Sequence, residues 1–211
     1  MSATNRGAIR KANDGYATPG WCVDRLLERV ALPAGHWLEP CAGHGAIINR
    51  VEGLRSDVRW SAVEVRAEHE ARLSEYNCRA LRIGDFLALS GTASLWPQFD
   101  VAITNPPYFF ARQFIQACRP IAKIVVMLLR VNFLAGEERQ PWISQDMPDV
   151  YVLPNRPSFT GKNVMVSRSG KKRKNATDAT EYCWGVWEGA PKTYGRVQVL
   201  GCTPVAERRA R

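Results

Sequence analysis

The segment Asn105-Pro106-Pro107-Tyr108 places two hydrogen-bond acceptors and an aromatic ring at the end of an apolar stretch. Proline removes backbone donors and stiffens the chain, so the Asn105 amide and the Pro106 carbonyl can be held in fixed positions beside the Tyr108 ring. We therefore expect Asn105, Pro106 and Tyr108 to be the catalytic residues.

An amino group that is conjugated to a nucleobase or an amide is a poor nucleophile, because its lone pair is delocalised. Two acceptors that bind its N–H bonds draw the nitrogen toward tetrahedral geometry and stabilise the positive charge that develops as it attacks an activated methyl group. The ring of Tyr108 would stack on the flat substrate and set its plane. The segment predicts methylation of a planar amino group, in a nucleobase or a glutamine side chain.

A glycine-containing turn, Glu39-Pro40-Cys41-Ala42-Gly43-His44-Gly45, follows an earlier expected strand. Glycines at such a turn allow close approach of a ligand at the carboxyl end of a sheet. Glu64 ends the next expected strand, about twenty residues further along, where a carboxylate is placed to accept hydrogen bonds from ribose hydroxyls. An ordinary tight turn and a solvated carboxylate are the alternatives for these two positions.

The turn Gly84-Asp85-Phe86 follows the third expected strand. Asp85 offers an acceptor for an exocyclic amino group, and Phe86 offers an aromatic face for a purine. The alternative is a Gly-Asp turn that precedes a core phenylalanine. Together with the two preceding positions, this turn predicts a site for a nucleoside-containing cofactor.

Short β-rich stretches alternate with stretches of helical spacing, which predicts an α/β fold: a single domain over residues 1–211, with a seven-stranded, mainly parallel sheet and helices on both faces. The expected strands are 36–40, 58–65, 79–83, 100–105, 124–129, 150–153 and 182–187. The expected helices are 23–30, 46–51, 66–76 and 110–118. Residues 135–148 show no clean period. We expect residues 1–14 and 204–211 to be flexible.

The chain of 211 residues carries a formal net charge of +9, which favours a polyanionic partner. Residues 155–177 contain no acidic residue and form an expected basic loop, most of it in 157–177. Six scattered cysteines form no C-x-x-C pair, so we expect reduced thiols, no metal and a cytoplasmic location. No apolar stretch is long enough to predict a membrane segment.

Taken in order, these motifs resemble the class I, Rossmann-like amino-methyltransferases, and most closely the small phage- and prophage-type DNA adenine-N6 methyltransferases. The matching positions are the catalytic segment 105–108, the cofactor turn with Glu39, Cys41, Gly43 and Gly45, and the acidic positions Glu64 and Asp85. Upstream, Tyr16-Ala17-Thr18-Pro19 resembles the segment that packs against the methionine end of the family's cofactor. Residues 153–159 and 180–184 resemble the segments around its sixth and seventh strands.

The resemblance implies S-adenosyl-L-methionine as methyl donor, a last strand that runs antiparallel, and an adenine rotated out of its DNA duplex. It implies cofactor contacts from Tyr16, Thr18, Pro19 and Phe86 as well, and substrate contacts from Tyr108 and Phe159. Cations of the basic loop would hold the DNA backbone, and they are Arg156, Lys162, Lys171, Lys172 and Arg173. The chain departs from the family in its E-P-C-A-G-H-G turn, where D-P-F-x-G-x-G is commoner, and in the length of the basic loop.

Several alternatives stay open at this point. Adenine in RNA and a glutamine in a translation release factor share the chemistry, although the release-factor family carries an N-terminal helical recognition domain. A DNA-binding protein with a degenerate methyltransferase fold is the non-enzymatic alternative.

Cys41 is not expected to be the nucleophile of a C5-cytosine enzyme, because the catalytic cysteine of those enzymes follows a proline after the fourth strand. Only 135–148 and 157–177 remain for reading bases, which predicts a short or relaxed target sequence and no obligate protein partner.

Overall fold

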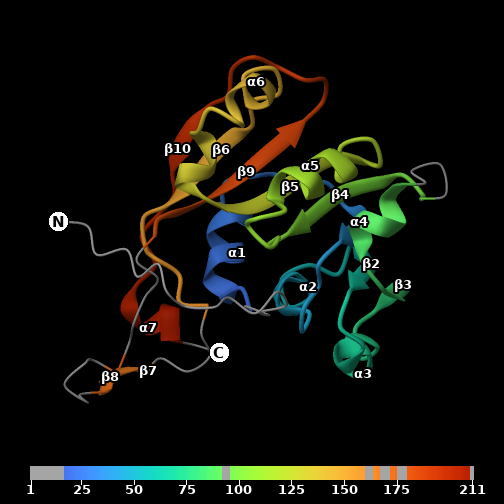
Figure 1. The fold of residues 1–211 in the computed structure, drawn as a ribbon. Helices are drawn as coiled ribbons and strands as arrows, with labels where there is room; N and C mark the ends of the chain where they lie inside the picture. Colours follow the sequence, from blue (N-terminus) through green and yellow to red (C-terminus); the bar gives the residue numbers. More distant parts are fainter. Residues whose placement is uncertain (1–16, 92–95, 160–163, 167–171, 175–179, 210–211) are drawn as a thin grey trace.

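The computed structural model describes residues 17–91, 96–159, 164–166, 172–174 and 180–209. Its centre is an eight-stranded sheet in the order β10-β6-β9-β5-β4-β1-β2-β3 (Figure 1). The strands of this sheet are β1 (Gly35–Glu39), β2 (Val58–Glu64), β3 (Cys78–Ile83), β4 (Phe99–Thr104), β5 (Ala122–Arg130), β6 (Asp149–Leu153), β9 (Tyr182–Glu188) and β10 (Val197–Val199). A separate two-stranded sheet pairs β7 (Val164–Val166) with β8 (Lys172–Lys174).

The strands from β3 to β5 are all parallel to their neighbours. β9 lies between β5 and β6 and runs antiparallel to both. The predicted fold class and the antiparallel late strand are therefore confirmed. The predicted count of seven was wrong by one, because the three-residue β10 adds a strand parallel to β6.

Alternating side chains along the strands build one core on each face of the sheet. In β5, Ile124, Val126 and Leu128 face one core, and the residues between them face the other. Such continuous apolar strands are typical of a parallel sheet that is covered on both sides. Trp184 and Trp187 of β9 are buried on opposite faces, as expected for core residues.

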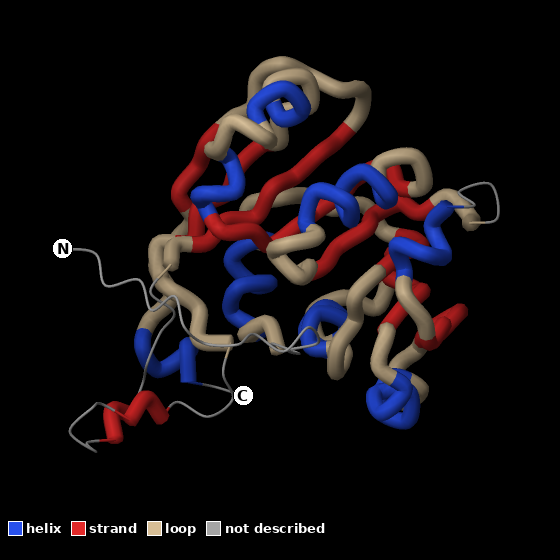
Figure 2. The backbone as a smooth tube through the Cα atoms, viewed as in Figure 1, coloured by secondary structure: helices blue, strands red, loops and turns tan. Residues whose placement is uncertain are grey.

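Helices cover both faces, as Figure 2 shows in blue on either side of the red strands. The first core is covered by α1 (Gly20–Leu27), α2 (Ala46–Glu52) and, after the short η1 (Ala67–His69), α3 (Glu70–Leu73). The second is covered by α4 (Phe86–Leu89), α5 (Ala111–Cys118), η3 (Val131–Leu134) and α6 (Gln140–Ile143). Apolar residues three and four positions apart, such as Phe114, Ile115 and Cys118 in α5, pack each helix on its face.

Three segments differ from the sequence-based expectation. The stretch 135–148 contains α6, which the sequence did not indicate because a single turn is too short to show a period. The C-terminal stretch, expected to be flexible, contains α7 (Val205–Arg209), whose Glu207 pairs with Arg25 of α1 at 2.7 Å. The basic loop contains the β7–β8 pair, whereas residues 1–14 lie outside the described residues.

In the part of the chain that the structure describes, no helix has the length and apolar character to span a membrane.

Trp184 fastens α1 to the sheet, because its indole Nε1 donates a hydrogen bond of 2.9 Å to the carbonyl of Cys22. We expect Trp184→Phe to lower the free energy of unfolding by about 2 kcal/mol, through the lost hydrogen bond and the lost ring volume. The control is Tyr194→Phe, since Tyr194 is 76% exposed, and it should change the value by less than about 0.5 kcal/mol. Urea unfolding measures both, and equal effects would contradict this role of Trp184.

Candidate active site

The carboxyl ends of four parallel strands bring the predicted residues to one edge of the sheet. Glu39 pairs in register with Ala62 of β2, and Glu64 pairs with Ile83 of β3. Asn105 follows the last residue of β4, which neighbours β1. Open α/β sheets bind their ligands at this edge, so the backbone alone places the predicted motifs together.

Glu39 is a buried carboxyl with unused hydrogen-bonding capacity. Its side chain is 2% exposed, and Oε2 has no hydrogen-bond partner in the part of the chain that is described. Burial raises the pKa of Glu39 well above its ordinary value, and the nearby charge of Glu64 raises it further. A buried oxygen without a donor is costly, so this position fits a ligand that presents N–H groups or a positive charge.

The turn after β1 adopts backbone conformations that favour glycine, with φ of 57° at Gly43 and 75° at Gly45. At Gly45 a side chain would also collide with the ring of Tyr76, so a packed neighbour excludes it. At Gly43 the nearest atom to an added Cβ is an Arg66 guanidinium nitrogen at 3.9 Å. The space beside Gly43 is thus bordered by the end of a side chain instead of packed backbone, and it fits the close approach of a ligand.

Glu64 holds the glycine turn in place. Its side chain is 3% exposed, and Oε2 accepts a hydrogen bond of 2.7 Å from the backbone N–H of Gly43. Oε1 forms an ion pair of 2.7 Å with Nε of Arg66. Glu64 lies where a ribose acceptor was predicted, but a ribose diol would have to replace Arg66 at Oε1.

At the turn after β3, Asp85 is exposed and Phe86 is buried. Asp85 is exposed and caps α4, because its Oδ1 accepts a hydrogen bond of 2.9 Å from the N–H of Leu87. Phe86 is 1% exposed and packs against Trp96 and Phe114, with ring centroids 5.5 and 5.7 Å away. The Phe86 ring therefore belongs to the core, which corrects the prediction that it offers an open face to a purine.

Asn105 is oriented by a residue far away in the sequence. Its Nδ2 donates a hydrogen bond of 3.1 Å to the hydroxyl of Thr18, which is 6% exposed. The thiol of Cys41 lies 3.8 Å from the Asn105 carbonyl. Because Thr18 takes up the amide nitrogen, Oδ1 of Asn105 is presented as an acceptor, as the predicted chemistry requires. Pro19 follows Thr18 as the N-cap of α1, whereas Tyr16 lies outside the described residues.

Tyr108 belongs to an aromatic group assembled from three parts of the chain. Its ring lies 5.6 Å from that of Tyr182 at the start of β9, and Tyr182 lies 5.0 Å from Phe159. Phe159 is 8% exposed. The predicted substrate residues Tyr108 and Phe159 are thus brought together through Tyr182, which the sequence did not single out.

Arg130, the last residue of β5, is a further site residue that sequence reasoning missed. Its guanidinium carbon lies 4.7 Å from the Tyr108 ring centroid, a cation–π contact, and its Nε is buried without a hydrogen-bond partner among the described residues. The only signal in the sequence was a cation at the carboxyl end of the fifth expected strand. Arg130 limits the positions that the Tyr108 ring can take.

The predicted DNA-backbone contacts are placed only in part. Arg156 pairs with Glu181, its Nε lying 2.9 Å from the carboxylate, so its charge is partly neutralised. The backbone of Lys172 and Arg173 forms part of β8. Lys162 and Lys171 lie outside the described residues. The role of these cations stays a prediction.

Cys41 is unsuited to be a nucleophile. Removal from water, together with the charges of Glu64 and Glu39, raises the pKa of its thiol to about 12. The thiolate is the reactive form, so the raised pKa disfavours Cys41 as a nucleophile. No group of three or more metal-ligating side chains occurs in the portion of the chain that the structure describes.

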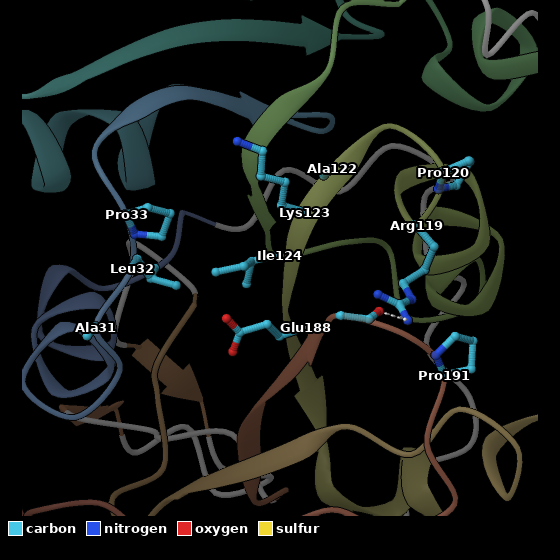
Figure 3. Close-up of a pocket in the computed structure, with 11 residues that line it drawn as sticks. Ala31, Leu32, Pro33, Arg119, Pro120, Ala122, Lys123, Ile124, Glu188 and Pro191 are labelled. Atoms are coloured by element: carbon cyan, nitrogen blue, oxygen red, sulfur yellow. Dashed lines mark hydrogen bonds between the residues drawn. The ribbon is translucent and has the colours of Figure 1, made fainter.

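A cavity of about 1040 Å³ lies at the opposite end of the sheet, around the first residues of β5 (Figure 3). Ile124 and Glu188 project toward it from β5 and β9, and Leu32 and Pro33 border it from the segment before β1. None of the predicted site residues lines this cavity. The chemistry-bearing side chains gather at the carboxyl edge instead.

Comparison with known proteins identifies the fold. No family model and no curated protein matches the chain. Among solved structures it is similar to a predicted O-methyltransferase from Agrobacterium tumefaciens, with a TM-score of 0.54, 13% identity and coverage of 86% of this chain and 84% of that one. A putative O-methyltransferase from Klebsiella pneumoniae gives a TM-score of 0.53, 14% identity, and coverage of 85% and 84%. A precorrin-6y C5,15-methyltransferase from Geobacter metallireducens gives a TM-score of 0.52 and 14% identity, and the match covers 81% of this chain and 87% of that one.

These neighbours share the Rossmann-like class I methyltransferase fold, which is therefore the fold of this chain. At 13–14% identity the likeness concerns the fold alone. The strand pairing of this chain, and not the likeness, brings Glu39, Glu64 and Asn105 to one edge of the sheet.

We expect Gly43→Ala to raise the Kd for S-adenosyl-L-methionine at least about tenfold, because a methyl group there occupies the space for the ligand. Its cost in folding free energy should be only about 1–2 kcal/mol, from the positive φ. Gly189→Ala is a matched control, since Gly189 has φ of 67° and nothing within 4 Å of an added Cβ. Calorimetric titration and thermal unfolding compare the two. An unchanged Kd in Gly43→Ala would exclude this turn from the cofactor site.

We expect iodoacetamide to label Cys41 slowly at pH 8. With a pKa of about 12, only about one Cys41 in ten thousand is a thiolate at that pH. Its labelling rate should rise about tenfold for each pH unit up to the pKa. Cys202 is exposed and serves as the internal comparison in peptide mass spectrometry. Labelling of Cys41 as fast as Cys202 at pH 8 would contradict this account.

Proposed function

We propose that the protein is an S-adenosyl-L-methionine-dependent methyltransferase that modifies the N6 amino group of adenine in DNA. The observation that carries the proposal is the position of the Asn105 amide. Thr18 holds this amide, which lies three residues before Tyr108 and next to the turn 39–45, by a hydrogen bond. The class I methyltransferase fold supports the reaction type, and the motifs of the chain support the amino-group substrate.

The residues present fit the cofactor. Glu39 has a buried oxygen that lacks a donor, Gly43 leaves room for close approach, and Glu64 can accept hydroxyl groups in exchange for Arg66. Asp85 is exposed at the same edge and can accept an exocyclic amino group. When bound, S-adenosyl-L-methionine supplies the electrophilic methyl group.

The protein's part in the reaction is positioning and electrostatic stabilisation. Oδ1 of Asn105 and the carbonyl of Pro106 accept the two N–H bonds of the adenine amino group, which become more acidic as the nitrogen gains positive charge. Tyr108 holds the plane of the base, and Arg130 with Tyr182 fixes the Tyr108 ring. A preorganised hydrogen bond of this kind contributes about 10²–10³ in kcat.

A nucleic acid is the proposed substrate because of the charge of the chain, and DNA is preferred to RNA because the motifs resemble those of DNA adenine-N6 methyltransferases. The net charge is +9, and residues 155–177 carry cations with no acidic residue. Cations that neutralise phosphates contribute affinity without reading sequence, so we propose a short or relaxed target. The basic segment also distinguishes this proposal from a release-factor glutamine, which needs no polyanion contact.

The test incubates the protein and labelled S-adenosyl-L-methionine with plasmid DNA, ribosomal RNA and a release factor, and identifies the methylated product by mass spectrometry. We expect N6-methyladenine in the DNA. Asn105→Ala should lower the rate at least about 100-fold and change the cofactor Kd by less than about threefold. Asn49→Ala, at an exposed position of α2, is the matched control.

Methylation of RNA or of the release factor in place of DNA would overturn the proposed substrate and keep the reaction type. Cofactor binding with no transfer to any of the three would favour a DNA-binding protein with a degenerate fold. Full activity of Asn105→Ala would overturn the proposed mechanism.

A further inference from the structure

Two phenylalanines project from the chain directly after Tyr108. Phe109 is 86% exposed and Phe110 is 42% exposed, and Phe109 has the highest exposed fraction of the large apolar residues that the structure describes. Burial of a phenyl ring is favourable, because it removes apolar surface from water. The exposed ring of Phe109 does not gain this free energy. Together with Phe110, whose ring it contacts, Phe109 forms an exposed apolar pair that is available to a binding partner.

The backbone that carries Phe109 is held on both sides. Two prolines precede Tyr108, and the N–H of Phe110 donates a hydrogen bond of 2.8 Å to the Pro107 carbonyl. Phe110 is the N-cap of α5, and its carbonyl accepts a hydrogen bond of 3.0 Å from the N–H of Phe114. The rings of Phe109 and Phe110 lie edge to face, with centroids 5.0 Å apart. The ring of Phe109 is thus carried by a backbone that hydrogen bonds hold on its C-terminal side, and it contacts the ring of Phe110.

The surroundings of Phe109 permit a polyanion to approach. From Val101 to Gly136 the sequence contains no aspartate or glutamate. Of the four cations in this stretch, Arg119 and Lys123 lie at the opposite end of the sheet, where they pair with Asp146 and Asp100. The other two lie nearer to Phe109: Arg130 contacts Tyr108, and Arg112, in the first turn of α5, has its guanidinium carbon 5.6 Å from the Trp142 ring centroid. Exposed aromatic rings interleaved with cations are a combination that binds nucleic acid through stacking and phosphate contacts.

The position of Phe109 fixes what it would meet in such a complex. It is the next residue after Tyr108, so the two Cα atoms are about 3.8 Å apart. A base that stacks on Tyr108 must leave its duplex, and it leaves behind an unstacked gap. Apolar side chains that enter base steps stabilise such gaps in other DNA-binding proteins.

We propose that Phe109 inserts into the base stack of duplex DNA beside the adenine that is rotated toward Tyr108, with Phe110 supporting its ring. This inference rests on the proposed function and adds a residue that opens the duplex. It makes Phe109 necessary for double-stranded substrates and dispensable where the adenine is already unpaired.

The test first locates a methylated adenine in plasmid DNA treated with the wild-type protein. Three synthetic substrates then carry that site: a perfect duplex, the same duplex with an abasic site opposite the adenine, and the single strand. Phe109→Ala should lower kcat/KM on the perfect duplex about 10–100-fold, the range expected when unstacking loses its apolar support. On the abasic duplex and the single strand it should stay within about threefold of wild type, and Phe109→Trp should restore activity on the perfect duplex.

Tyr194→Ala is the matched control, because Tyr194 is a 76% exposed aromatic residue outside the site. Thermal unfolding should show no change for either alanine variant, since both rings are mostly in water. Equal losses on all three substrates, or no loss on the perfect duplex, would overturn the role of Phe109 and leave the proposed function standing. If the wild-type protein methylates no DNA, the proposed function fails, and the inference fails with it.

Discussion

The buried carboxylate of Glu64 is the interaction on which the candidate site depends. One oxygen holds the Gly43 N–H at the end of β1, and the other pairs with Arg66 at the end of β2. Backbone hydrogen bonds extend the same connection, from the N–H of Ala42 to Val63 and from the N–H of Gly84 to Glu64. Three strand-to-helix turns are thereby held at fixed positions, which is the preorganisation that a binding site at the sheet edge needs.

The proposed catalytic segment, which begins at Asn105, is joined to this edge through Cys41 and Thr18. Thr104 donates a hydrogen bond of 3.3 Å to the Cys41 carbonyl, and the Cys41 thiol lies near the Asn105 carbonyl. The raised pKa of Cys41 keeps that thiol neutral, so it packs in the turn without adding charge beside Glu39 and Glu64. The elements proposed to bind the cofactor and the amino group are consequently neighbours, as transfer between two bound molecules requires.

The sequence predicted seven strands of the main sheet, and the gathering of the motif positions at one edge follows from them, because long apolar strands and the turns after them leave strong local signals. It did not predict β10, since Val197 and Val199 are exposed and the strand exists only through pairing with β6. Phe86 was misjudged because an aromatic residue after a Gly-Asp turn has the same local pattern whether it faces a ligand or the core. The contacts of Thr18 with Asn105 and of Tyr182 with Tyr108 join residues far apart in the chain, and no spacing rule reveals them.

A crystal structure of the protein with S-adenosyl-L-homocysteine tests the central claim most directly, because it locates the cofactor without requiring the substrate. The account predicts the ligand at the carboxyl edge, with its ribose hydroxyls on Glu64, Arg66 displaced from that carboxylate, and its amino-acid end near Glu39 and Thr18. A ligand bound elsewhere, such as in the cavity beside Ile124 and Glu188, or an edge that stays empty at saturating ligand, would contradict it.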